Sequence, residues 1–135
     1  MTKKYFNLII DAESKPYWEA AKEKKLLIQK CKETNKCFLY SRRLQNISIS
    51  DNFEWIEAKG IGKIYSFTIV YSAAGDYYID KVPYVVASID LIEGVRIISN
   101  ILTDCPEKTK INDKVYVVFD KITDEITIPR FKIKN

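Results

Sequence analysis

The chain of 135 residues contains no histidine. This absence removes the usual general base near neutral pH, the Ser–His and Cys–His nucleophile pairs, and imidazole as a metal ligand. Cys105, which precedes Pro106, is the candidate thiol nucleophile, but no histidine is available to activate it. We therefore expect a non-catalytic protein, in which Cys105 is a small apolar residue or a loop thiol.

Cysteines and long apolar runs are also scarce. The three cysteines are odd in number and unevenly spaced, which disfavours a disulfide framework. No apolar run approaches the roughly 18 residues that a membrane helix needs, and the N-terminal apolar stretch is too short for a signal peptide. We expect a cytoplasmic protein with no membrane partner. Its composition, 47% hydrophobic and 30% charged, is that of a globular domain.

The stretch from Gly60 to Tyr71 is the strongest strand pattern in the chain. Two glycines lead into a run of β-formers in which Tyr65, Phe67, Ile69 and Tyr71 fall on one face at period two. Both faces are fairly apolar, and the glycines permit a bend or a close backbone approach. This pattern predicts the long, bent first strand of a small closed barrel.

Four further strands are predicted over residues 83–91, 95–102, 114–119 and 126–131. In the first of them the apolar face that we expect to point inward consists of Val85, Ala87, Ile89 and Leu91. Glu93–Gly94 is a tight hairpin turn, and Pro129 marks the last strand as an edge or a bulge. Five strands in this order predict an OB-fold barrel over residues 53–135 in a mainly β protein.

The N-terminal segment, residues 1–25, contains a predicted helix over residues 14–25. Ser14 is placed to cap it, Pro16 lies in its first turn, and lysines crowd its last turn. Its apolar face holds Tyr17 and Trp18. This face packs on the chain's own barrel or, in the alternative interpretation, Trp18 anchors a partner protein.

Residues 26–52 have the outline of a zinc-ribbon knuckle: a short strand, a polar turn and a second strand. Five residues separate Cys31 from Cys37, whereas zinc knuckles place two thiolates about two to four residues apart and add a second pair. The segment that follows, residues 41–50, has no cysteine. Two thiolates without histidine do not complete a tetrahedral site, so we predict a metal-free hairpin.

Several segments together resemble the DUF35 family. They are Tyr17–Ala20, Leu27–Cys31, Gly60–Thr68, Val82–Ala87, Leu91–Arg96, Val115–Phe119 and Pro129–Phe131. The resemblance covers residues 14 to 131. It implies an N-terminal helix, a small rubredoxin-like zinc ribbon and a C-terminal OB-fold associated with acyl-CoA.

The ribbon departs from the family's pattern of two Cys-x2-Cys pairs. Cys31 sits at the first ligand position, but Thr34 occupies the second, and residues 45–48 cover the second pair without a thiol. Cys37 is not at a ligand position. We therefore expect a degenerate ribbon without zinc or another cofactor. The side chains expected to fill its small core are Phe38, Leu39, Tyr40 and Leu44.

The resemblance implies an accessory, non-catalytic subunit that organises a thiolase-like acyltransferase, synthase or other CoA-ester enzyme and helps to shape its acyl-CoA channel. The expected partner-binding residues are Tyr77, Tyr78, Ile79 and Trp18. The candidate contacts to CoA phosphates are Arg42, Arg43, Lys63 and Lys81. Two alternatives remain open: the tyrosines fold back to cover the barrel's end, and the paired arginines form only a solvated turn.

The alternative function is a single-strand nucleic-acid-binding protein, because OB barrels bind such strands with stacking aromatics and a basic groove. Nine tyrosines and a net charge of +4 permit it. Acidic residues in or near the strands and loops that would form the groove oppose it. These are Asp76, Asp80, Asp90 and Glu93.

Overall fold

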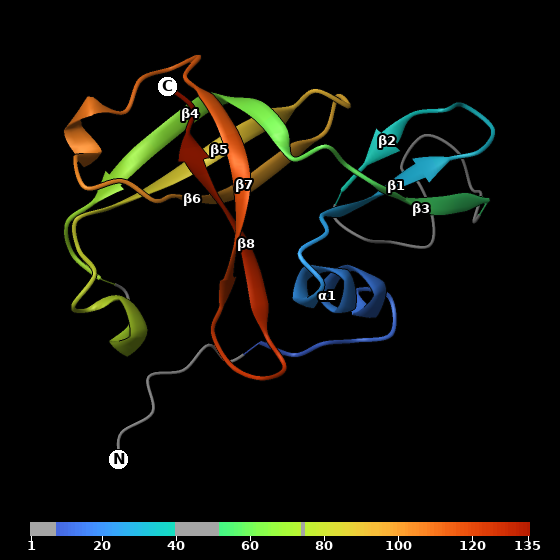
Figure 1. The fold of residues 1–135 in the computed structure, drawn as a ribbon, viewed down its shortest axis with the longest axis horizontal. Coiled ribbons are helices and arrows are strands. Elements are labelled where there is room, and N and C mark those ends of the chain that lie inside the picture. The colour runs from blue at the N-terminus through green and yellow to red at the C-terminus, as the bar shows by residue number, and fades with distance from the viewer. Residues whose placement is uncertain (1–7, 40–51, 74) are drawn as a thin grey trace.

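The computed structural model describes residues 8–39, 52–73 and 75–135 and is mainly β, as expected (Figure 1). One helix, α1, precedes a three-stranded sheet of order β2-β1-β3 and a closed five-stranded barrel of order β4-β5-β6-β8-β7. This order is that of an OB-fold, which confirms the predicted fold class. The element bounds are α1 (Lys15–Lys22), β1 (Leu27–Cys31), β2 (Cys37–Phe38), β3 (Phe53–Glu57), β4 (Ile61–Val70), β5 (Tyr84–Leu91), β6 (Arg96–Ile101), β7 (Lys114–Lys121) and β8 (Thr127–Ile133), with 3-10 turns at Asp76–Tyr78 and Pro106–Lys108.

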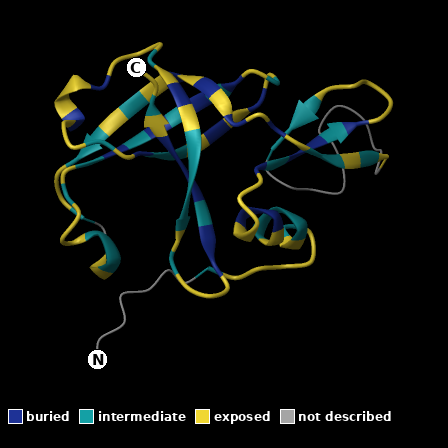
Figure 2. Ribbon diagram, in the orientation of Figure 1, coloured by how far each residue is buried: buried dark blue, intermediate teal, exposed yellow. Residues whose placement is uncertain are grey.

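The barrel core is built from alternate residues of its strands, coloured as buried in Figure 2. All four residues predicted to face inward on β5 are at most 3% exposed, which confirms that face. They meet Ile97 from β6, Val115 from β7 and Phe131 from β8 in one cluster. Period-two burial of apolar side chains thus closes the barrel around a single core.

A β-bulge in β4 changes which face its side chains share. The register with β5 shifts between Ile64 and Ser66. Ile64 is fully buried, Tyr65 is exposed, and Phe67 packs against the core. The prediction that Tyr65 and Phe67 share a face was therefore wrong, because one extra residue at a bulge reverses the alternation.

Gly62, just before the bulge, provides the close backbone approach expected at the entry to this strand. A Cβ at Gly62 would collide with the backbone carbonyl oxygen of Asp90 on the paired strand β5. Gly60 has φ +73, a conformation that side chains disfavour, and its carbonyl accepts from the N–H of Val117. These two glycines join β4 to its neighbours on both sides.

The strand pairing that closes the barrel between β6 and β8 is short. Among the described residues, these parallel strands share one register pair, Ile101 with Phe131, whereas β8 runs beside β7 over its whole length. Residues 97–100 and 127–130 therefore face each other across a seam without a full hydrogen-bond ladder. Pro129, which we expected at an edge or a bulge, lies in this stretch of β8.

The ribbon sheet lies beside the barrel, and α1 packs against β1, β7 and β8 (Figure 1). The domain boundary was expected before Phe53, yet β3 pairs along its length with β1, so the sheet includes residues 53–57. Leu26 and Ile28 from this side belong to the same core cluster as the barrel residues. The ribbon therefore shares its apolar core with the barrel.

Helix α1 begins at Lys15, with Ser14 at the N-cap position and Pro16 in its first turn. The expected side-chain cap was wrong: the Ser14 hydroxyl donates instead to the Asp11 carboxylate at 2.7 Å. This hydrogen bond, with the one from the Ser14 backbone N–H, lowers the pKa of Asp11. No helix among the described residues is long and apolar enough to cross a membrane.

Candidate functional site

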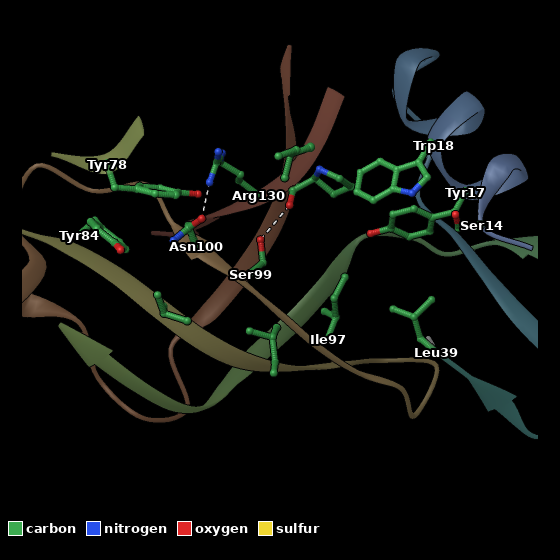
Figure 3. Close-up of a pocket in the computed structure, with 14 residues that line it drawn as sticks. Ser14, Tyr17, Trp18, Leu39, Tyr78, Tyr84, Ile97, Ser99, Asn100 and Arg130 are labelled. Atoms are coloured by element: carbon green, nitrogen blue, oxygen red, sulfur yellow. Dashed lines mark hydrogen bonds between the residues drawn. The ribbon is translucent and has the colours of Figure 1, made fainter. Parts of the chain in front are cut away.

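A groove of about 470 Å³ crosses the seam between β6 and β8. Tyr17 and Trp18 of α1 stand at one end, and Tyr78 and Tyr84 stand at the other (Figure 3). The side chains between these two aromatic ends are mostly aliphatic, among them Ile97. The half-buried side chain of Trp18 thus lines a cavity of its own chain, and its ring meets that of Tyr17 edge to face at 4.9 Å.

Hydrogen bonds from polar side chains take the place of backbone hydrogen bonds along the seam between β6 and β8. The Ser99 hydroxyl donates to the carbonyl oxygen of Pro129 at 2.8 Å. The Asn100 side-chain amide donates to the carbonyl oxygen of Val85 on the neighbouring strand β5 at 3.0 Å, and its Oδ1 accepts across the seam from Nη1 of Arg130 on β8. Buried backbone groups are costly when left without partners, so these bonds allow the strands to separate at the seam.

Arg130 is the central charge of the site and is only 3% exposed. Its Nε donates to Oδ2 of Asp120 at 2.7 Å, and its Nη1 donates to Oδ1 of Asn100. Burial alone would lower the pKa of Arg130, but hydrogen bonds and charge interactions with Tyr78 and Asp120 outweigh it and raise the pKa. The arginine is therefore fully charged, and Asp120 balances that charge within the fold.

The Asp76–Tyr78 turn folds back onto the end of the barrel. The ring of Tyr78 stacks on that of Tyr84 with centroids 4.7 Å apart, and it meets the ring of Tyr77 edge to face. Burial raises the pKa of Tyr77. These contacts hold the two rings beside Tyr84 at the start of β5, and whether they act as a cover or as a docking surface stays a prediction. Ile79 remains 62% exposed at the same turn, and its role in docking stays a prediction.

A second cavity of about 310 Å³ lies beyond Tyr78. It shares Tyr78, Tyr84, Asn100 and Arg130 with the groove, and it adds Lys81. The Tyr78 ring, held between Tyr84 and Arg130, therefore stands at the boundary of the two spaces.

The candidate CoA contacts do not gather at one place among the described residues. Lys63 is exposed near the start of β4, opposite Asp90 of β5. Lys81 lies beyond the far end of β4, with its Nζ 4.5 Å from the centroid of the Tyr77 ring and 3.7 Å from the Asp80 carboxylate. Arg42 and Arg43 fall outside the described residues.

Sequence reasoning missed the group that organises the groove, namely Ser99, Asn100, Asp120 and Arg130. Two signals for it were present. Asn100 interrupts an apolar strand pattern, and Arg130 falls between Pro129 and Phe131 within a predicted strand. A charged residue at a strand position next to core residues is a sign of a buried ion pair. Its partners, however, lie 10 and 30 residues away in the chain.

Two curated archaeal relatives match most of the chain. Each is named "DUF35 domain-containing scaffold protein". The one from Methanocaldococcus jannaschii is 34% identical over 110 residues, which is 80% of this chain and 77% of the relative. The one from Methanothermobacter thermautotrophicus is 32% identical over 97 residues, 71% of this chain and 72% of the relative. The chain belongs to the DUF35 family.

Other DUF35 relatives include components of enzymes. Residues 55–120 match the family described as "ChsH2, C-terminal OB-fold domain". A chain from the solved structure of an Ltp2-ChsH2(DUF35) aldolase matches with TM-score 0.84 and 27% identity, covering 94% of this chain and 98% of that one. A solved DUF35 protein from Sulfolobus solfataricus, with TM-score 0.64 and 16% identity, shares the fold.

A longer bacterial relative is named "Probable enoyl-CoA hydratase alpha subunit" and comes from Thermomonospora curvata. It is 29% identical over 125 residues, which is 91% of this chain. The chain spans 38% of that relative's length.

The DUF35 resemblance implied a zinc ribbon, but the donors present here do not fit one. Cys31 is buried on β1, and Cys37 lies opposite Lys30 on β2. Burial raises the pKa of the Cys37 thiol. Within the described ranges, no group of three or more histidine, cysteine, aspartate or glutamate residues is placed to hold a metal ion.

The ribbon's expected core is found in part. Phe38 of β2 meets Phe53 of β3 edge to face with centroids 6.2 Å apart, and Leu39 packs against the main core. The other two expected core residues, Tyr40 and Leu44, fall outside the described residues.

Proposed function

We propose that this DUF35 protein is a non-catalytic accessory subunit that binds and organises a CoA-ester enzyme of the thiolase-like kind and helps to shape its acyl-CoA channel. The observation that carries the proposal is the match to a chain of the solved Ltp2-ChsH2(DUF35) aldolase, which extends over 94% of this chain and 98% of that one. A match of this extent includes the helix, the ribbon and the barrel together. The scaffold names of the archaeal relatives support the same role.

The chemistry of the groove supports a role without catalysis. The chain has no histidine. Among the described residues of the groove, the Ser99 hydroxyl is bonded to a carbonyl oxygen and Arg130 is paired with Asp120. A catalytic acid or base needs a titratable group within reach of the reacting proton. These groups instead stabilise the barrel.

The surface that we propose for docking is the turn from Asp76 to Lys81. Ile79 presents an aliphatic side chain to solvent while Tyr77 and Tyr78 hold the turn against the barrel. A rigid turn with an exposed apolar residue loses little entropy on binding, and such residues become buried anchors in interfaces. Trp18, which lines the groove, is a second candidate because its side chain is half-buried.

The test is co-expression with a thiolase-like enzyme from the same host. We expect the two chains to co-purify and the CoA-ester activity to require both. Ile79→Asp should lower retention about tenfold or more by placing a charge in the interface. Ile111→Asp is the matched control, because Ile111 is exposed to a similar extent, 51% against 62%.

Two results would contradict the proposal. In the first, the enzyme is fully active alone and never retains this chain. In the second, this chain by itself turns over a CoA ester. If both isoleucine variants behave alike, the docking surface lies elsewhere and only that part of the proposal fails.

The nucleic-acid alternative predicts salt-dependent binding to a single-stranded oligonucleotide. On the outer face of the barrel, Arg96 pairs with Asp90 at 2.6 Å and covers the ring of Tyr65 at 3.5 Å. A stacking aromatic and a basic group are thus already engaged with each other there. We expect no oligonucleotide binding at physiological salt.

A further inference from the structure

We infer that the groove across the β6–β8 seam is a binding site for a neutral, hydrocarbon-rich small molecule, such as an aliphatic chain or a fused-ring body. This inference goes beyond the proposed function, because it concerns a ligand held by this chain alone. It stands on three observations: the shape of the groove, the chemistry of its walls, and the balance of its charges.

The shape suits one elongated small molecule. The volume of about 470 Å³ lies within the range of about 300–1,000 Å³ typical of small-molecule sites. The rings of Tyr17 and Trp18 bound one end, and the stacked rings of Tyr78 and Tyr84 bound the other (Figure 3). A flat or extended apolar molecule would contact aromatic faces at both ends and aliphatic side chains between them.

The walls of the groove are apolar where β6 and β8 lack a full ladder of backbone hydrogen bonds. Ile98 of β6 is 59% exposed at this groove, and Val86 and Ile128 line it with partly buried side chains. Removing apolar surface of this kind from water stabilises a complex in proportion to the area buried. Binding of a hydrocarbon body in the groove is therefore favourable.

The charge balance selects a neutral ligand. The guanidinium of Arg130 is bonded to the Asp120 carboxylate and to the Asn100 amide oxygen. An anion entering the groove would lose its hydration while meeting a positive charge that Asp120 already balances. A carboxylate or phosphate group is thus disfavoured inside the groove, whereas an uncharged body incurs no such cost.

The experiment uses the full chain and the neutral dye Nile red, whose fluorescence rises in apolar surroundings. We expect saturable binding with one dye per chain. Ile98→Asp should weaken the affinity about tenfold, because it places a charge on the groove wall. Ile92→Asp is the control: Ile92 is 57% exposed and does not line the groove, so its affinity should not change.

Competition tests the class of ligand. Decanol should displace the dye at a concentration about tenfold lower than decanoate, which is ionised at neutral pH. Melting temperatures of both variants should match that of the parent protein, since both positions face solvent.

Three outcomes would overturn the inference. They are dye binding that does not saturate, an equal loss of affinity in both variants, and decanoate displacing the dye better than decanol. Loss of partner binding in the co-purification experiment would leave this result untouched. Failure of the proposed function and failure of the groove are thus separable.

Discussion

The ribbon sheet is built from antiparallel strand pairs, as is the barrel except between β6 and β8, but the two reach stability differently. The barrel closes on itself, and every strand buries residues in one interior core. Within its described residues the ribbon has three short strands, one of them only the two residues Cys37–Phe38. A sheet of this size is marginal without a metal or a packing partner.

The difference shows how a ribbon can persist when its thiol ligands are missing. Leu26 and Ile28 join the same cluster as barrel residues, and Ile56 of β3 packs against it. Helix α1 contacts β1 of the ribbon and also β7 and β8 of the barrel. We expect apolar packing onto the closed barrel to provide the constraint that metal coordination provides in zinc ribbons.

The largest expected effect is the destabilisation of the barrel by a charge in its core. Leu91→Asp should lower the free energy of unfolding by about 3–5 kcal/mol, because it leaves an unpaired charge in a small core. Leu91 is 3% exposed. Chemical denaturation monitored by circular dichroism measures the change.

The adjacent residue provides the control for that variant. Ile92 points outward, so Ile92→Asp should change the free energy of unfolding by no more than about 0.5 kcal/mol. Equal stability of the two variants would show that the assigned interior face of β5 is wrong.

A smaller effect tests whether the ribbon and the barrel share one core. Ile28→Ala should cost about 2–5 kcal/mol and lower the stability of the whole chain. Both tryptophans, Trp18 and Trp55, lie outside the barrel, so their fluorescence reports on α1 and the ribbon while circular dichroism is dominated by the barrel strands. The two signals should change together in a single transition.

Separate transitions, with the tryptophan signal lost first, would instead show a ribbon that unfolds independently of the barrel. Ile9→Ala is the control, because Ile9 lies fully at the surface and should have little effect.

The smallest expected effect concerns metal at the ribbon. Elemental analysis of protein purified without chelator should find no stoichiometric zinc, and adding a chelator should leave the melting temperature unchanged. The reason is that, among the described residues, Cys31 and Cys37 belong to no group of three or more possible metal ligands. About one zinc per chain, lost on Cys31→Ser, would refute this expectation and make the ribbon a metal-stabilised unit.

Patterns within short segments of the sequence were sufficient to predict much of the barrel. The alternation of β5 predicted its buried face, and Glu93–Gly94 predicted the turn, where Gly94 has φ +86. Both features depend on residues close together in the chain. The bulge after Ile64 was not foreseen, because a single inserted residue leaves no trace in a run of β-formers.

Most of the candidate site could not be predicted from patterns within short segments of the sequence. For Tyr77 and Tyr78 the sequence left docking and covering both open, because the positions of their rings depend on Tyr84 and Arg130, which lie on other strands. Lys63 and Lys81 are placed far apart by the length of β4. Proximity of this kind is set by strand order and not by periodicity.

By itself the sequence determined the period-two core of the barrel, the backbone freedom at its glycines, and the absence of an imidazole for catalysis. Only the tertiary structure decided that β6 and β8 separate and that Ser99 bridges the seam to Pro129, 30 residues further along the chain. It also decided that Arg130 is buried against Asp120. The physical reason is that side-chain alternation follows from the geometry of one strand, whereas a seam and its ion pair arise only when distant strands close into a barrel.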